Sequence, residues 1–365
     1  MKVVLVSLAR RGGMLHFLAE LANALAPMCH VSVVVGNTAQ RGYFDGTPKM
    51  VRVDLGKGGL GTILAVANLL TWYRLWRRLS ALEPDLVHVV GVHELNPAIG
   101  IITRFLHVPL IYTVHDPEAH PGAPRSIRWA DSITARLATH LVVLTNTGRN
   151  QLIDRGFTSD KISVIIHPVY TLFRRWASPR AKTGRHIVFF GRLEAYKGID
   201  ELLEAYSSIR GDMPGWTLTL VGSGLPSASL SASRGPNIRV INRYVSDRLA
   251  ARLMSTAGIV VLPYTSGTQS GIASLAQAFD RPVIASRVGG MHEMVIDGRT
   301  GILVPPGDVA ALAEAMRKLS ADPKRLARMR RLVARQRRAD ASPRNVAKAH
   351  MHVYARILEA EGGAT

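Results

Sequence analysis

Two stretches of the chain share one plan: PYTSGTQSGIASLAQAFDRPVIASRVGGMHE at residues 263–293 and HIVFFGRLEAYKG at residues 186–198. Each joins an apolar strand to a glycine-containing turn and then to a helix. Such turns gather unpaired N–H groups and the partial positive charge of a helix N-terminus, which suits a phosphate ester. Arg192 and Lys197 lie on the turn of the second stretch. The two stretches therefore predict an α/β fold that binds a nucleotide-activated compound.

Apolar segments alternate with helical ones along the whole chain, as in parallel sheets covered by helices. The predicted strands are 2–8, 30–36, 49–55, 85–91, 108–116, 140–146, 161–168, 186–191, 216–222, 237–242, 258–264, 281–286 and 301–305. We expect an α/β fold of two Rossmann-like, doubly wound domains facing a cleft. The predicted limits are an N-terminal domain at 1–172, a hinge linker at 173–184, a C-terminal domain at 185–342 and a C-terminal helix at 343–365 that packs back toward the N-terminal domain.

The composition limits the expected cellular compartment and the kinds of ligand site that the chain can form. Cys29 is the only cysteine, so no intrachain disulfide can form, and a reducing cytoplasm is the expected location. The N-terminus does not read as a secretory signal, and no run of about 20 apolar residues predicts a membrane-spanning helix. The chain has no Asp-x-Asp pair and no His/Cys cluster with metal-ligand spacing. We therefore expect no metal site.

The net charge of +20 bears on partners rather than on the fold. Residues 323–338 carry eight basic residues and no acidic one. Three interpretations stay open: a solvated helical face, contact with an anionic membrane, and contact with nucleic acid. Nucleic acid is the least favoured, because no aromatic residues interleave the charges and no binding module is recognisable.

A helix predicted at 62–82 is a second candidate for contact with a membrane. It combines an apolar stripe with neighbouring arginines: Trp72, Leu75, Trp76, Leu79 and Leu82 beside Arg74, Arg77 and Arg78. Such a helix either lies in a lipid interface or faces the core with a basic outer side. The overall charge favours reversible, peripheral contact with an anionic surface on the inner face of the plasma membrane.

Polar and glycine residues follow two strands of the first half. Gly12 and Gly13 allow close approach of backbone to a ligand, or simply close a tight turn. His16, one turn into the next helix, is expected to be a surface residue. His115 and Asp116 end a later strand, where ligands of α/β domains bind. The alternative for them is a polar turn with an Asp cap, followed by the His120-Pro121-Gly122 turn.

The second half offers the stronger candidates. Arg192 and Lys197, beside Gly191, would stabilise the charge of a departing diphosphate without reorganisation; a surface salt bridge is the structural alternative. The loop after the strand at 258–264 exposes small residues and backbone N–H groups: Thr268, Gln269, Ser270 and Gly271. Glu293, in the first turn of the next helix, is explained fully by capping, and a ligand role for it needs other support.

The second half resembles a known family through FFGRLEAYKGIDELLEA, LTLVGSG, ARLMSTAGIVVLPY and AFDRPVIASRVGGMHEMVIDGRTGILVPPGD, in order and spacing. The family is the large retaining family 4 of the GT-B glycosyltransferases. The first half resembles it only weakly, through Gly12-Gly13 and TVHD. The resemblance implies that Arg192 and Lys197 contact the donor diphosphate. It also implies that His115 lies near the donor sugar and that Gly12 and Gly13 line the cleft.

The resemblance further implies transfer of a sugar from a UDP- or GDP-sugar to a glycan or lipid-linked acceptor, in bacterial polysaccharide or glycolipid assembly. Because the chain has no Asp-x-Asp pair, we expect Arg192 and Lys197 rather than Mg²⁺ to neutralise the diphosphate. The N-terminal domain would bind the acceptor and the C-terminal domain the donor. One departure matters: typical members carry two glutamates where this chain has Gly267 and Leu275. Backbone amides of residues 268–271 and the Gln269 side chain are candidates for the first role. The alternative is a catalytically inactive sugar-nucleotide or glycan-binding protein of the same fold.

Overall fold

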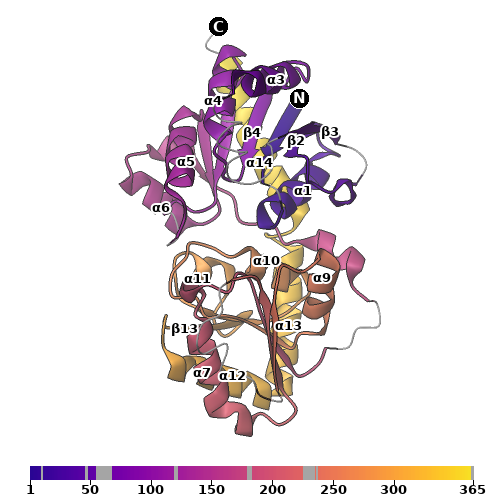
Figure 1. The fold of residues 1–365 in the computed structure, drawn as a ribbon, viewed down its shortest axis with the longest axis vertical. Helices are drawn as coiled ribbons and strands as arrows, with labels where there is room; N and C mark the ends of the chain where they lie inside the picture. The colour runs from indigo at the N-terminus through magenta and orange to yellow at the C-terminus, as the bar shows by residue number, and fades with distance from the viewer. Residues whose placement is uncertain are drawn as a thin grey trace. The chain divides into compact units, whose positions relative to one another are not determined.

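The computed structural model describes residues 1–9, 11–45, 48–54, 68–118, 122–178, 183–224, 235 and 237–362. The chain divides into two compact units (Figure 1). The first comprises Met1–Pro168 and Ser342–Thr365, and the second comprises Val169–Ala341. Several sequence predictions fall outside the described residues: the start of the helix at 62–82, part of the hinge at 173–184, and the His120-Pro121 turn.

The first unit is built on a seven-stranded sheet. Its strands are β1 (Lys2–Ser7), β2 (His30–Gly36), β3 (Lys49–Val53), β4 (Leu86–Val90), β5 (Leu110–Val114), β6 (His140–Val143) and β7 (Ile162–Val164). They follow the order β3-β2-β1-β4-β5-β6-β7, and every neighbouring pair is parallel. The direction of the strand order reverses between β1 and β4, which is where a ligand of such a sheet binds.

Helices cover both faces of this sheet. They are α1 (Gly13–Leu25), α3 (Leu69–Ser80), α4 (Asn96–Phe105), α5 (Arg125–Leu137), α6 (Asn146–Asp154) and α14 (Pro343–Gly362), with short 3₁₀ turns η1 (Arg41–Tyr43) and η2 (Ser159–Lys161). One core cluster joins the sheet to α3, α4, α5 and α6 through Leu75, Ile99, Ala135 and Leu152. The C-terminal helix α14 packs against α1. Residues from the two ends of the chain therefore build one unit.

The second unit repeats the plan with six parallel strands. They are β8 (His186–Phe190), β9 (Thr217–Gly222), β10 (Ile238–Asn242), β11 (Ile259–Leu262), β12 (Val283–Ser286) and β13 (Gly301–Val304), in the order β10-β9-β8-β11-β12-β13. The other elements are η3 (Thr171–Trp176), η4 (Ala195–Lys197), α7 (Ile199–Ile209), η5 (Arg210–Asp212), α9 (Asp247–Thr256), α10 (Gly271–Ala278), α11 (Met291–Met294), α12 (Val309–Ala321) and α13 (Pro323–Arg338). The predicted α/β fold of two Rossmann-like domains is confirmed.

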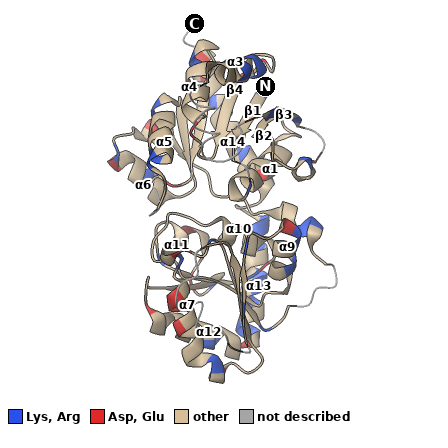
Figure 2. Cartoon of the chain, in the orientation of Figure 1, with Lys and Arg blue, Asp and Glu red and all other residues tan. Residues whose placement is uncertain are grey.

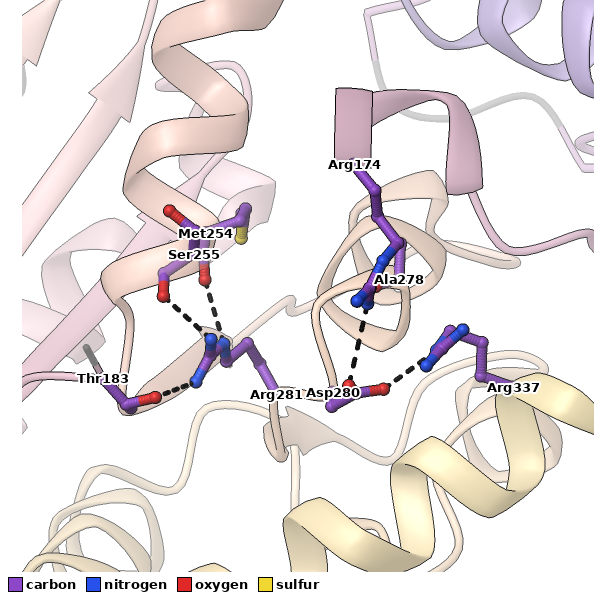
Figure 3. Close-up of polar contacts among 8 residues, drawn as sticks. All are labelled: Arg174, Thr183, Met254, Ser255, Ala278, Asp280, Arg281 and Arg337. Atoms are coloured by element: carbon purple, nitrogen blue, oxygen red, sulfur yellow. Dashed lines mark hydrogen bonds and ion pairs between the residues drawn. The ribbon is translucent and has the colours of Figure 1, made fainter. Parts of the chain in front are cut away.

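A buried arginine ties helices of the second unit together (Figure 3). Arg281 donates from Nε to the Met254 carbonyl at 3.0 Å and from Nη2 to the Ser255 carbonyl at 2.8 Å. Both carbonyls belong to the last turn of α9, where a cation offsets the negative end of the helix. Burial lowers the pKa of Arg281 to about 10, so the side chain keeps its charge. Beside it, Asp280 accepts a hydrogen bond from Arg337 Nε at 2.9 Å.

One expectation about side-chain exposure was wrong, and the core-facing alternative left open for the helix at 62–82 holds for only part of it. His16, expected at the surface, is 6% exposed, and its ring packs edge-on against Tyr43 with 5.3 Å between centroids. α1 packs against both the sheet and α14, so little of it is left exposed. In α3, Leu75 and Leu79 face the core as the apolar stripe predicted, but Trp76 is 40% exposed. The stripe is therefore only partly a core face.

The basic stretch at 323–338 forms α13, which buries Met329 and Val333. Its exposed cations are spaced alternately by four and three residues, so they share one side of the helix: Lys324, Arg328, Arg331, Arg335 and Arg338. Figure 2 shows Lys and Arg in blue along α13. This arrangement agrees with the solvated helical face that the sequence left open.

Candidate functional site

The best candidate site lies in the second unit, where β8 and β11 are neighbours and the strand order reverses. The turn after β8 comes very close to the end of β11. Gly198 has φ 68°, and a Cβ there would stand 1.8 Å from the Pro263 carbonyl oxygen. Thr265 N also donates to the Tyr196 carbonyl at 2.9 Å. The glycine lets the cation-bearing turn lie against the carboxyl end of β11.

Two cations lie on this turn, each with aromatic contacts. Lys197 Nζ is 3.6 Å from the centroid of the Tyr264 ring and 4.8 Å from that of Tyr196. Arg192 pairs with Glu194 at 2.9 Å and donates to the Tyr196 hydroxyl at 2.8 Å. Burial raises the pKa of Tyr264 and of Tyr196 to about 12, so both phenols are neutral at ordinary pH. These contacts hold the two positive groups in a defined place.

The loop after β11 supplies a helix N-terminus. The Ser270 hydroxyl accepts from Ile272 N at 3.2 Å, and it lies 3.2 Å from the Tyr264 hydroxyl. α10 has no acidic residue in its first turn, whereas α7 begins with Asp200 and Glu201. From the sequence, a helix start after each of the two stretches is expected to favour an anion, and that stays a prediction. Because carboxylates already offset the dipole of α7, the positive end of α10 is the less neutralised of the two helix starts.

Two oxygen atoms in this loop are buried and unsatisfied. Ser266 Oγ and Gln269 Oε1 are shielded from solvent and have no hydrogen-bond partner among the described residues. A buried polar atom left unpaired costs about 1–3 kcal/mol, so such atoms mark places where a ligand group is expected. We call Arg192, Lys197, Tyr264, Ser266 and Gln269 the switch-point site.

Backbone contacts fix the other predicted residues around this loop. Gly290 N donates to the Thr268 carbonyl at 2.7 Å, and a Cβ on Gly289 would stand 2.2 Å from the Gly267 carbonyl oxygen. Glu293 follows in the first turn of α11, half-buried, which is the capping position that the sequence indicated. Within the described ranges, no group of three or more His, Cys, Asp or Glu side chains is placed to hold a metal ion.

The first unit brings its own candidates together at the carboxyl edge of its sheet. Gly12, with φ 90°, is the N-cap of α1, which begins at Gly13. His115 follows β5 and packs edge-on against Phe17 of α1, with 4.9 Å between ring centroids. Burial, and to a smaller degree His167, lowers the pKa of His115 to about 3. The imidazole is therefore neutral at ordinary pH and offers one donor and one acceptor.

Two family models match the chain, one in each half. A family model described as Glycosyl transferases group 1 matches residues 184–322, and one described as Glycosyl transferase 4-like domain matches residues 12–166. Glycogen synthase of Mycobacterium tuberculosis (strain ATCC 25618 / H37Rv) is 30% identical over 296 residues, which cover 77% of this chain and 69% of that protein. The chain belongs to the group 1 glycosyltransferases.

Other relatives and solved structures agree with this family. D-inositol 3-phosphate glycosyltransferase of Acidothermus cellulolyticus is 32% identical over 65% of this chain and 60% of its own length. Anabaena HepE in complex with UDP-glucose superimposes with a TM-score of 0.75 at 17% identity, covering 98% of this chain and all of that one. Sucrose-phosphate synthase from Thermosynechococcus elongatus gives 0.71 at 20% identity, covering 98% and 99%. At these identities the two structures show the GT-B fold.

In this glycosyltransferase, sequence reasoning missed Tyr264, Tyr196 and Glu194, whereas Ser266 belongs to the loop at 266–271 that the sequence had already indicated as a ligand loop. A cation stacked on a ring seventy or so residues away leaves no local pattern in the sequence. One signal was available. In a Rossmann-like sheet of order 3-2-1-4, the first and fourth strands are neighbours. In the second half these are the predicted strands at 186–191 and 258–264, and Tyr264 ends the latter. Placing the two predicted strands side by side would have brought Lys197 and Tyr264 together.

Proposed function

We propose that this glycosyltransferase moves a sugar from a UDP- or GDP-sugar to a hydroxyl of a glycan or lipid-linked acceptor, with retention of configuration and without a metal ion. The observation that carries the proposal is the switch-point site: two held cations, the N-terminus of α10 and two unpaired buried oxygens at the carboxyl ends of neighbouring strands. Bacterial polysaccharide or glycolipid assembly is the proposed setting.

The charge of the site matches the chemistry of the leaving group. As the bond between the sugar and the diphosphate breaks, negative charge grows on the diphosphate oxygens. Preorganised donors at that point lower the barrier, because they need not reorganise during the reaction. Arg192 and Lys197 supply the positive charge. The backbone N–H groups of Gln269 and Gly271, at the start of α10, would supply neutral donors. The Gly191 N–H, predicted for this role, already donates to the Val221 carbonyl at 2.9 Å.

The remaining residues orient the sugar. Gln269, and Glu293 from α11, would bind donor hydroxyls, and the unpaired Gln269 Oε1 supports the first of these assignments. In the first unit, His115 would hydrogen-bond a sugar hydroxyl as a neutral imidazole, while the backbone of Gly12 and Gly13 allows close approach. The nucleotide assignment draws support from HepE, whose structure was determined with UDP-glucose.

Retention follows if the acceptor attacks the anomeric carbon on the face that the diphosphate leaves. The acceptor oxygen forms the new bond to carbon, the carbon–phosphate oxygen bond breaks, and the departing phosphate oxygen takes the acceptor proton. This route needs no side-chain base. Arg192 and Lys197 then have one task, which is to stabilise the departing phosphate.

Removing both cations tests the proposal. Arg192→Ala with Lys197→Ala should lower the rate of acceptor-dependent nucleotide release at least a hundredfold, because each cation acts on the charge that develops in the transition state. Arg317→Ala with Lys318→Ala is the matched control, since these exposed α12 residues form salt bridges with Glu314 and the loss of charge is the same. Unchanged release in the first variant would refute the assignment.

A second function is favoured by one specific observation. The positions at which the family resemblance expects glutamates hold Gly267, a residue without a side chain, and Leu275, which is 2% exposed inside α10. A chain that kept the fold but lost the chemistry would bind sugar nucleotides or glycans without turning them over. Titration with UDP- and GDP-sugars, followed by a nucleotide-release assay with a panel of acceptors, separates the two: binding without any release would favour this second function.

A further inference from the structure

The outer side of α3 is unusual for a helix that covers a sheet, because large apolar side chains lie on its solvent side. Leu69 is 81% exposed, Leu70 48%, Tyr73 52% and Trp76 40%, while Leu75 and Leu79 face the core. Leu69, Tyr73 and Trp76 are spaced by four and three residues, so they share one side of the helix. The Tyr73 and Trp76 rings lie 5.8 Å apart. This apolar strip is therefore continuous and separate from the core.

Basic residues flank the strip. Arg74 and Arg77 are exposed on the neighbouring side of α3, and within the described ranges neither has a carboxylate partner. Arg78, the third arginine, donates to the Arg52 carbonyl and so is held against β3. The twelve residues of α3 include no Asp or Glu. Figure 2 shows these basic residues on α3. We call Leu69, Leu70, Tyr73, Trp76, Arg74 and Arg77 the α3 outer face.

We propose that the α3 outer face binds the surface of an anionic lipid bilayer. Leucine, tyrosine and tryptophan side chains enter the boundary between headgroups and acyl chains, where aromatic rings with a polar edge are favoured. Arg74 and Arg77 beside them attract acidic headgroups, each by roughly fivefold in binding. An acidic protein would match the arginines but would leave Leu69 and Trp76 without a matching environment. A purely apolar partner would leave the arginines unpaired.

The geometry points to a helix lying on the bilayer rather than crossing it. Among the helices of the described ranges, none is both long enough and apolar enough to span a membrane. α3 is anchored by its other side, through Leu75 and Leu79 in the core of the first unit and through its packing on α4. α4 ends at Phe105, which is 76% exposed, with the exposed Arg104 beside it. The binding helix is thus presented by a folded unit.

Vesicle flotation without any substrate tests this inference independently of sugar transfer. The probes are vesicles of phosphatidylcholine alone and of phosphatidylcholine mixed with phosphatidylglycerol. The unaltered chain should float with the anionic vesicles at low salt and stay behind with the neutral ones. Arg74→Gln with Arg77→Gln should lower the partition coefficient about twenty- to thirtyfold. Tyr73→Ser with Trp76→Ser should lower it at least tenfold.

The control removes the same charge from another exposed helix. Arg331→Gln with Arg335→Gln on α13 should lower the partition coefficient less than threefold. Thermal melting within 2 °C or so of the unaltered chain shows that each variant is folded. If the unaltered chain fails to float with anionic vesicles, or if the α13 variant loses as much binding as the arginine variant of α3, the inference is wrong. Self-association that Tyr73→Ser with Trp76→Ser abolishes would assign the face to a second copy of the chain and would also overturn it.

Discussion

Gly198 is the residue on which the geometry of the switch-point site depends most. It follows Lys197 directly, adopts a left-handed conformation, and lets the turn after β8 approach the Pro263 carbonyl. Any side chain there would push the turn away from β11 and move the Lys197 ammonium off the Tyr264 ring. The absence of a side chain at Gly198 thus sets the position of Lys197, one of the two cations of the proposed donor site.

Gly198→Ala should therefore destabilise the fold and weaken nucleotide binding together. The left-handed conformation costs a side chain about 1–2 kcal/mol, and the clash adds on the order of 1–3 kcal/mol. Chemical denaturation should show a loss of about 2–5 kcal/mol. Gly211→Ala is the control, because a Cβ there meets nothing within 4 Å and should change stability by less than about 0.5 kcal/mol. Equal stability of the two variants would contradict this account of the turn.

Arg192 and Lys197 were predictable from sequence because a basic residue on a turn between an apolar strand and a helix is a local pattern. The partners of the same residues were not. Glu194 lies two positions from Arg192 but reads as an ordinary surface acid, and Tyr264 reads as the end of a buried strand. Which side chains meet depends on strand order, which no local pattern carries. Only the strand order usual for a Rossmann-like sheet would have placed Tyr264 near Lys197.

A buried histidine network holds the C-terminal helix on the first unit. His88 Nδ1 lies 2.7 Å from the Tyr354 hydroxyl of α14, and His88 Nε2 lies 2.7 Å from the Thr113 hydroxyl of β5. The His350 ring stands 5.5 Å from that of His88, between centroids. Burial lowers the pKa of His350 to about 4 and that of His88 well below its usual range. The helix is therefore attached through rings that must stay neutral.

This network predicts a loss of stability in mild acid. The folded pKa of His350 lies below the unfolded value of about 6.5, so the unfolded chain binds more protons between these limits. The free energy of unfolding should fall as the pH drops from about 6.5 to about 4, by on the order of 3 kcal/mol for His350 alone. His350→Leu should reduce the pH dependence measured by urea denaturation by about that amount, and the other buried histidines, such as His88 and His115, keep the rest. His352→Leu, exposed on the same helix, should leave it unchanged; the reverse result would contradict the assignment.

The strands and helices were predicted more fully than the exposure of their side chains. Each predicted strand, from Lys2 to Val304, has a counterpart in one of the two sheets, because buried parallel strands are short apolar runs bounded by turns. The exposure of His16 and Trp76 was not predictable in the same way. The periodicity of a helix gives its apolar side, but not whether a second helix covers it or solvent does.

The two units of the molecule follow from the repeated alternation of strand and helix, and the sequence predicted both Rossmann-like folds. The domain limits placed at 1–172, 173–184, 185–342 and 343–365 stay predictions. In the structure, α14 belongs to the first unit although it follows the second in sequence. The two units divide the work in the proposed function: the second binds the nucleotide diphosphate, and the first binds the acceptor. Only the second unit therefore has to carry the positive site.

Calorimetric titration of the whole chain with UDP and with GDP, in buffer containing EDTA, tests the central claim most directly. We expect at least one of these nucleotides to bind without a divalent ion. Arg192→Ala with Lys197→Ala should raise its dissociation constant at least tenfold, while Arg317→Ala with Lys318→Ala should leave it within about twofold. Binding that requires Mg²⁺, or equal affinity of the two double variants, would contradict the claim.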